Sequence, residues 1–293
     1  MSSHKPLFAF FGTPIMAVYV LDALEARGLL PALVVCTPDK PKGRGLELTP
    51  TPAKEWALAR GIDVITPVSL KDLSAMPELT NTDWDIFVVA AYGKLIPKLV
   101  LDIPRRGCLN VHPSLLPKFR GPSPVVSAIL ADEHTTGVSV MLMDEQMDHG
   151  PVVAQGRIEF APEDWPQRAS VLTELLFTEG ANLLAEVLPQ WLAGEVTPVV
   201  QDELQVSLTK KFTPEDALVN PLGDAHQELL KIRAFDLGPR PYCFATLQNG
   251  QEARVVITDA EIQDGKLVLL KVIPEGKKEM AFEEFLRNGA KIH

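Results

Sequence analysis

The sequence predicts an α/β chain in which a mostly parallel sheet is followed by a smaller, β-rich carboxyl-terminal domain. In the first two thirds, short apolar runs rich in β-branched or aromatic residues alternate with helical stretches, as in βαβ units. After residue 221 the pattern changes to closely spaced apolar segments separated by Asn-Gly and Asp-Gly turns. The 293 residues, 46% of them hydrophobic, are enough for one large and one small core.

The strands expected in the sheet are Leu7–Phe11, Ala32–Thr37, Asp63–Thr66, Asp85–Ala91, Leu109–His112, Gly137–Asp144 and Val152–Ile158. Helices are expected at Ile15–Arg27, Ala53–Arg60 and Ala169–Ala193. The first strand ends at Gly12-Thr13-Pro14, which lacks the Gly-x-Gly-x-x-Gly pattern, so we expect a Rossmann-like sheet without a dinucleotide. The same early break favours a buried strand over a secretion signal.

Domain boundaries are expected at 1–207 for the sheet domain, 208–221 for a polar, proline-punctuated linker and 222–293 for the second domain. The last of these begins with a helix at Ala225–Ala234. Its expected strands are Tyr242–Leu247, Ala253–Ala260, Leu267–Ile273 and Met280–Leu286. We expect an open barrel of the oligonucleotide-binding type, that is, OB-like.

Composition narrows the class of protein. No run of eighteen apolar residues occurs, so we expect no membrane span. The three cysteines are odd in number and far apart, which favours the reducing cytoplasm and disfavours structural zinc. We expect a cytoplasmic monomer.

The net charge of −10 disfavours a nucleic-acid partner unless basic residues cluster locally. Candidate clusters are Lys40, Lys42 and Arg44, then Lys210-Lys211, then Lys277-Lys278. Each can equally be a solvated face.

Asn110, His112 and Asp148 are the candidate catalytic residues. Asn110 and His112 lie two apart on one strand, so their side chains share a face beside a proline-rich loop. An amide can stabilise the oxyanion of a tetrahedral intermediate, and an imidazole can hydrogen-bond that oxygen or move protons. A carboxylate can orient the imidazole or accept a proton from an attacking amine. The trio therefore suits acyl transfer to an amine, which is itself the nucleophile.

Two other interpretations compete at these positions. An Asn-x-His at a strand end is often only a structural pair, and an Asp before His149-Gly150 is often only a turn residue. His112, Asp148 and His149 could also be metal ligands, but they lack a recognised ligand spacing. From the residues alone, these alternatives remain open.

The segment from Asn110 to Gly121 resembles the signature of the 10-formyltetrahydrofolate-dependent formyltransferases. In that family the Asn-x-His pair and a downstream Asp are catalytic, which implies the same roles for Asn110, His112 and Asp148. The resemblance also implies that the folate co-substrate lies along Ser114, Leu115, Leu116 and Pro117, against Phe87, Ala91, Tyr92 and Gly93. No metal is expected.

The acceptor is suggested by a second segment. Residues Pro38 to Lys54 are similar to a loop of the methionyl-tRNA formyltransferases, in which the Arg of Gly-Arg-Gly contacts the acceptor arm. The resemblance implies that Arg44 contacts initiator methionyl-tRNA, with Lys42 and Lys40 supplying further phosphate and base contacts. The physical alternative is a surface loop without a partner.

The chain departs from the family pattern in places. Pro113 stands where Gly is usual, His149 where Thr is usual, and Pro122-Ser123-Pro124 where Ala-Ala-Pro is commoner. Three further functions therefore stay open: formylation of an amino sugar on a nucleotide, hydrolysis of formyltetrahydrofolate, and non-catalytic binding of RNA or folate.

Overall fold

The computed structural model describes residues 5–42 and 47–292, with only the backbone of Lys42 and Glu47. The chain forms two compact units, which we describe separately. The first comprises Met1–Arg120, Gly137–Arg157 and Glu174–Leu208, and the second comprises Gly121–Thr136, Ile158–Thr173 and Thr209–His293. These units interleave along the chain, so the boundaries 1–207, 208–221 and 222–293 stay a prediction.

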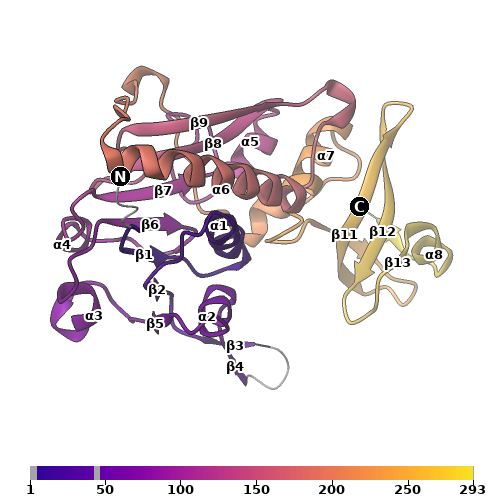
Figure 1. The fold of residues 1–293 in the computed structure, drawn as a ribbon. Coiled ribbons are helices and arrows are strands. Elements are labelled where there is room, and N and C mark those ends of the chain that lie inside the picture. The colour runs from indigo at the N-terminus through magenta and orange to yellow at the C-terminus, as the bar shows by residue number, and fades with distance from the viewer. Residues whose placement is uncertain (1–4, 43–46, 293) are drawn as a thin grey trace. The chain divides into compact units, whose positions relative to one another are not determined.

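The first unit is built on a seven-stranded sheet (Figure 1). Its strands are β1 (Phe8–Phe11), β2 (Leu33–Val35), β5 (Asp63–Ile65), β6 (Ile86–Ala90), β7 (Cys108–His112), β8 (Thr135–Leu142) and β9 (Val152–Glu159), in the order β5-β2-β1-β6-β7-β8-β9. The four pairings from β5 to β7 are parallel, and β7 pairs with β8 in the antiparallel direction. The predicted mostly parallel, Rossmann-like sheet is confirmed.

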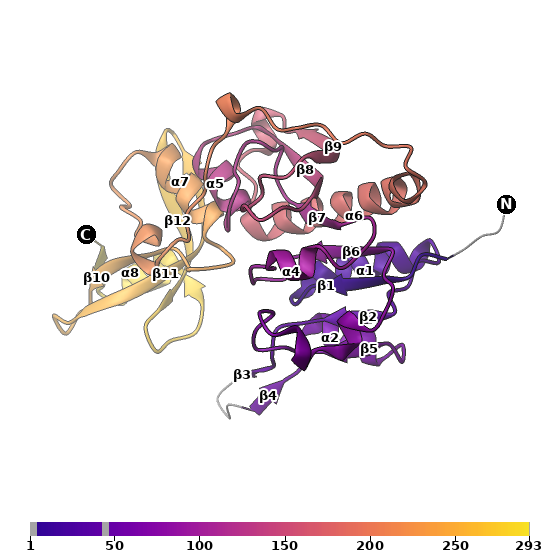
Figure 2. The same ribbon diagram turned by 90° about the vertical axis from the view of Figure 1, so that its left-hand side faces the viewer.

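The helices of this unit are α1 (Ile15–Ala26), α2 (Pro52–Leu58), α3 (Pro77–Thr80), α4 (Lys98–Leu101) and most of α6 (Ala169–Ala193), with short 3-10 turns at Leu73–Ala75 and Glu203–Gln205. Side chains of β1 alternate between two hydrophobic clusters. Phe8 and Phe10 pack with α1, α2 and α6, whereas Ala9 and Phe11 pack in the cluster that includes residues of α3 and α4. Figures 1 and 2 show the course of α1, α2, α4 and α6 beside the sheet. Burial of both faces explains why this strand is apolar throughout.

The second unit contains an antiparallel five-stranded sheet in the order β13-β12-β11-β10-β14. Its elements are α5 (Pro124–Leu130), α7 (Ala225–Ala234), β10 (Tyr242–Thr246), β11 (Glu252–Gln263), β12 (Lys266–Pro274), β13 (Met280–Ala281), α8 (Phe282–Arg287) and β14 (Lys291–Ile292), with 3-10 turns at Pro162–Asp164 and Pro214–Ala217. Asp264 and Gly265 both have positive φ, as a two-residue hairpin turn requires. The smaller β-rich second part of the predicted fold is confirmed.

Two segments differ from the local expectations. The predicted strand Met280–Leu286 is wrong beyond Ala281, because Phe282–Arg287 forms α8 and buries Phe285 against the sheet core. The expected loop from Pro38 to Lys54 begins as a two-stranded antiparallel ribbon of β3 (Lys40–Lys42) and β4 (Glu47–Thr49). No helix in the described parts of the chain is long and apolar enough to cross a membrane.

Gly180 allows α6 to approach the sheet closely. A Cβ atom there would lie 2.5 Å from a methyl group of Val111 and 2.6 Å from one of Val138. We expect Gly180→Ala to lower the free energy of unfolding by about 1–3 kcal/mol through overpacking, although alanine favours helices. Urea denaturation measures this. Thr178→Ala, at an exposed position of the same helix, should change stability by no more than about 0.5 kcal/mol; equal effects of the two variants would contradict the packing argument.

Candidate active site

Strand β7 places Asn110 and His112 on one face of the sheet. The alternate residues Leu109 and Val111 are buried in the core cluster that contains α1 and α6. Because side chains of a strand alternate between faces, Asn110 and His112 point away from that cluster. Asn110 is half-buried and His112 is 4% exposed. The predicted shared face therefore follows from core packing on the other side of the strand.

The end of β6 lies beside the end of β7. Ala90 is level with Val111 in the parallel register, so Ala91, Tyr92 and Gly93 continue next to His112. Gly93 is exposed, and the space that a Cβ would occupy there is open. Phe87 does not lie at this edge, because it pairs with Cys108 at the start of β7 and is fully buried between Phe11 and Trp84.

Tyr92 lies just beyond the carboxyl end of β6. The hydroxyl of Thr13 donates a hydrogen bond to the carbonyl of Tyr92 at 3.2 Å and accepts one from the amide of Thr37 at 3.1 Å, which ties β1, β2 and β6 together. Burial raises the pKa of Tyr92 to about 12. Its buried hydroxyl is therefore protonated at neutral pH, and it has no hydrogen-bond partner among the described residues.

The imidazole of His112 lies between a carbonyl and a carboxylate. Its Nε2 is 3.1 Å from the carbonyl oxygen of Phe119, and its Nδ1 is 3.6 Å from Oδ1 of Asp148. A carbonyl oxygen only accepts hydrogen bonds, so this contact puts a proton on Nε2. Nδ1 is then the nitrogen that faces the carboxylate. The side chain of Asp148 is 15% exposed, so solvent reaches the pair from the Asp148 side.

The structure brings His112 and Asp148 together from distant elements. Asp148 follows β8, in a loop where its φ is +52°. Asparagine and aspartate tolerate this left-handed conformation better than most residues. His149, next in the chain, hydrogen-bonds Oδ2 of Asp144 through Nδ1 at 2.6 Å and does not take part in the His112–Asp148 pair.

The segment Ser114–Pro117 is fixed by hydrogen bonds at nearly every residue. Ser114 is fully buried, and its hydroxyl donates to the carbonyl of Lys118 at 2.7 Å. The hydroxyl of Ser139 donates to the Ser114 carbonyl and accepts from the amide of Leu116, and Gln155 donates to the Leu116 carbonyl at 2.8 Å. Leu115 lies over Gly137, where any Cβ would clash with it. This loop is therefore a rigid wall beside β7.

Sequence reasoning missed the residues that hold these loops. They are Arg120, Ser139, Gln155, Gln201 and Ser207. Four of the five lie in no recognised sequence motif, and all five form hydrogen bonds with residues distant in sequence. Only Arg120 was part of the recognised motif, without a role of its own.

Two of the three predicted tRNA contacts, Lys40 and Lys42, lie on strand β3. Lys40 is exposed in β3, and Lys42 ends that strand. Arg44 lies outside the described residues. At the base of the ribbon, Lys54 pairs with Asp39 at 2.6 Å.

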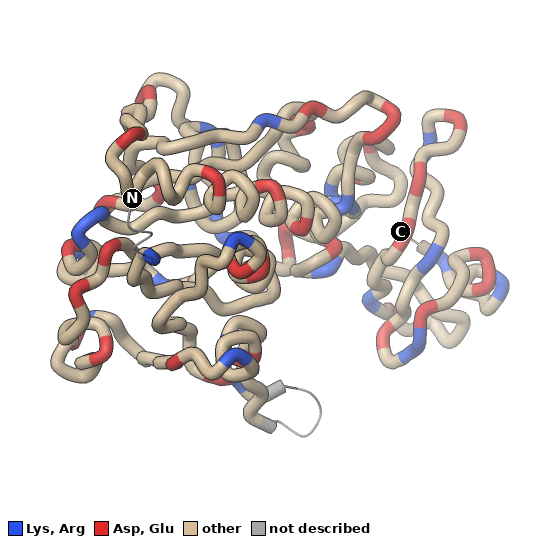
Figure 3. The backbone as a smooth tube through the Cα atoms, in the orientation of Figure 1, with Lys and Arg blue, Asp and Glu red and all other residues tan. Residues whose placement is uncertain are grey.

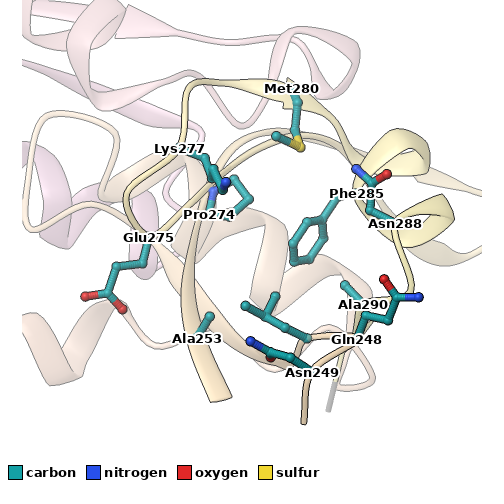
Figure 4. Close-up of a pocket in the computed structure, with 11 residues that line it drawn as sticks. Gln248, Asn249, Ala253, Pro274, Glu275, Lys277, Met280, Phe285, Asn288 and Ala290 are labelled. Atoms are coloured by element: carbon teal, nitrogen blue, oxygen red, sulfur yellow. The ribbon is translucent and has the colours of Figure 1, made fainter. Parts of the chain in front are cut away.

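The candidate metal ligands form no cluster of three in the described parts of the chain, and the second unit has a cavity of its own. Among residues 5–42 and 47–292, no group of three His, Cys, Asp or Glu side chains could hold a metal ion, so His112, Asp148 and His149 form no such group. A cavity of about 400 Å³ lies in the second unit, where Met280 and Phe285 contribute apolar surface and Gln248 and Asn288 contribute amides (Figure 4). It contains none of the predicted site residues.

Known proteins resemble this chain over most of its length. The formyl transferase family profile matches residues 5–188. The methionyl-tRNA formyltransferase of Chloroflexus aggregans is 42% identical over 88% of this chain and 84% of its own length. That of Thermus thermophilus is 39% identical over 95% of both chains.

A solved structure shares the fold. The structure of WlaRD, a sugar 3N-formyl transferase, in the presence of dTDP and 5-N-formyl-THF superposes with a TM-score of 0.64 over 94% of this chain and all of its own. At 16% identity, this likeness concerns the fold alone. The family profile and the curated relatives decide the assignment: the chain belongs to the formyl transferase family.

Proposed function

We propose that this enzyme transfers the formyl group of 10-formyltetrahydrofolate to the free amino group of initiator methionyl-tRNA in the cytoplasm. The observation that carries the proposal is the His112–Asp148 pair at the end of β7, beside a half-buried Asn110. The acceptor class is supported by curated relatives named methionyl-tRNA formyltransferase at 36–42% identity.

His112 and Asp148 act as a proton-handling pair in this proposal. The Phe119 carbonyl holds the Nε2 proton, so Nδ1 is the nitrogen that exchanges a proton near Asp148. A carboxylate 3.6 Å away stabilises the imidazolium that results. Asp148 is accessible enough to accept a proton from the attacking amine, either directly or through the imidazole.

Asn110 supplies the neutral donor. Its amide N–H can stabilise the negative charge that develops on the formyl oxygen during attack, without a charge of its own that would oppose the imidazolium. It lies on the same face as His112, two residues earlier on β7. A pre-placed donor on a buried strand does not need to reorganise during the reaction, and this is where such groups are most effective.

In this proposal the folate co-substrate lies along Ser114–Pro117 and beside Ala91–Gly93. Hydrogen bonds hold the Ser114–Pro117 loop in one conformation, which limits the entropy lost when a ligand binds beside it. Open space at Gly93 is available to a ligand, whereas the hydroxyl of Tyr92 is buried. When bound, the folate supplies the formyl group. Phe87 supports this edge from the core and is not proposed as a contact.

Formylation of an amino-sugar nucleotide is the second candidate, because WlaRD shares the fold. The segment from Pro38 to Lys54, with Lys40 exposed on its ribbon, favours tRNA instead. Lys, Arg, Asp and Glu are mixed along the backbone of both units (Figure 3). Because neither unit is basic throughout, we propose that a local basic segment such as Pro38–Lys54 attracts RNA.

For the catalytic trio, we expect His112→Ala, Asp148→Ala and Asn110→Ala each to lower kcat by roughly two to four orders of magnitude, because each removes an acid–base or oxyanion-stabilising group. Initial rates of methionyl-tRNA formylation measure this, with circular dichroism to check folding. Glu145→Gln changes an exposed carboxylate on the same loop and should stay within about twofold. If Asp148→Ala kept more than about a third of wild-type turnover, its role would be wrong.

For the folate site, we expect a crystal soaked with a folate analogue to show it along Ser114–Pro117 and beside Ala91–Gly93. The physical reason is the fixed backbone wall described above. Ser139→Ala removes two of the hydrogen bonds that hold this loop and should raise the apparent KM for the folate by about tenfold. An analogue in the cavity at Met280 and Phe285 would refute the assignment.

For the acceptor, we expect Arg44→Ala to raise KM for methionyl-tRNA or lower turnover by at least about tenfold, as the loss of one charge-assisted contact of about 1.5–3 kcal/mol implies. Hydrolysis of formyltetrahydrofolate should stay within about twofold, since the catalytic trio is unchanged. Rising salt should weaken wild-type tRNA binding more steeply than that of the variant.

Lys71→Ala, which removes an exposed cation outside this segment, is the control and should leave tRNA formylation unchanged. Equal tRNA formylation by wild type and Arg44→Ala would remove the loop from the proposal. A sugar-nucleotide enzyme would instead show no saturable dependence on tRNA in either protein.

A further inference from the structure

The loop that carries Asp148 is fastened by one buried side chain. The Nε2 of Gln201 donates hydrogen bonds to the carbonyl of Asp148 at 2.8 Å and to the carbonyl of Gly150 at 2.7 Å. Gln201 is 7% exposed. Both amide protons are therefore used on the two sides of His149.

The orientation of this amide is fixed from its other end. The Oε1 of Gln201 accepts a hydrogen bond from Nε of Arg120 at 3.0 Å, and an arginine can only donate. The amide nitrogen must then face the two carbonyls, so its orientation is determined by chemistry. Arg120 is 5% exposed and is itself held by Glu203, with Nη2–Oε1 at 2.7 Å.

Arg120 also belongs to the segment that positions His112. It directly follows Phe119, whose carbonyl contacts Nε2 of the imidazole. The amide of Phe119 donates to the hydroxyl of Ser207, and the amide of Arg120 donates to the carbonyl of Ser207. The chain Arg120–Gln201 therefore connects the backbone that holds His112 with the backbone that holds Asp148.

The Asp148 loop needs such a fastening. With φ at +52°, Asp148 is in a conformation that costs free energy and persists only when its surroundings enforce it. Gly150 runs so close to the carbonyl of Leu142 that a Cβ would lie 1.9 Å from that oxygen. The carboxylate reaches 3.6 Å from His112 only while this backbone path is kept.

We propose that Gln201, oriented by Arg120, is a positioning residue that holds Asp148 against His112. Only the expected change in kcat rests on the proposed function; the positioning of the Asp148 loop does not. A loop displaced by about 1 Å can cost about a hundredfold in rate without loss of substrate binding. The competing role is a general structural fastening with no preference for Asp148.

Gln201→Glu is the sharpest variant, because it keeps the size of the side chain and an acceptor for Arg120. It places an oxygen where the donating nitrogen faced two carbonyls. We expect kcat for methionyl-tRNA formylation to fall by about 10–100-fold, with KM for both substrates within about threefold. Amide hydrogen exchange of residues 144–150 should accelerate, while that of 181–188 in α6 should not change.

Gln155→Glu is the matched control. It alters the same chemical group where it holds the Leu116 carbonyl, on the proposed folate wall. We expect it to raise KM for the folate and to leave exchange of residues 144–150 unchanged. Gln201→Met, which removes the amide without adding a charge, provides the same test if Gln201→Glu does not fold.

A double-variant cycle separates positioning from general stabilisation. If Gln201 acts through Asp148, adding Gln201→Glu to Asp148→Ala should lower kcat by less than about twofold more, because the group it positions is already absent. The full 10–100-fold loss in the Asp148→Ala background would overturn the proposal, as would unchanged exchange of residues 144–150 in both Gln201 variants. If exchange accelerates as expected but wild type does not formylate methionyl-tRNA, the proposed function fails and the positioning role stands.

Discussion

The two-residue period of β7 is the constraint on which the site depends. One set of its side chains, Leu109 and Val111, is required by the hydrophobic core. The other set is thereby directed to the opposite face, where Asn110 and His112 lie at the carboxyl end of β7. A shift of the strand by one residue would turn both polar groups toward the hydrophobic core and the core residues toward the site. The hydrophobic effect thus fixes the direction of the polar residues without contacting them.

Backbone strain gathers at the same edge. Ala91, Phe119 and Asp148 have φ values of +49°, +61° and +52°, although none is glycine. Each such conformation costs on the order of 1–3 kcal/mol, which the surrounding hydrogen bonds must offset. Gln201 holds the carbonyl of Asp148 and Ser207 holds the amide of Phe119. Ser139 and Gln155 hold the nearby segment from Ser114 to Leu116. The rigid frame around the site is therefore made of neutral side-chain-to-backbone hydrogen bonds, with Arg120 as the one buried cation among them.

The sequence predicted the strands and helices of the first unit well where a strand period of two or a helix period of 3.6 was bounded by turn residues. It was less successful in short segments. Apolar and polar residues alternate only weakly in Phe282–Arg287, and this pattern resembles a strand. The segment nevertheless forms a helix, which buries Phe285 against the second sheet. Lys40–Lys42 and Glu47–Thr49 contain little that distinguishes a ribbon from a loop, and pairing with each other decides their conformation.

The sequence by itself determined the family, the catalytic candidates and the shared face of Asn110 and His112, since these depend on motif identity and on a period of two. The tertiary structure decided which distant groups meet. In the folded chain Asp148 lies 3.6 Å from His112, and Phe87 is buried in the core. His149 is hydrogen-bonded to Asp144. The tertiary structure also revealed Gln201, which the sequence shows only as one polar residue among several. The physical reason is that a side-chain hydrogen bond across 53 residues leaves no periodic pattern, because it depends on the position of a single donor in the folded chain.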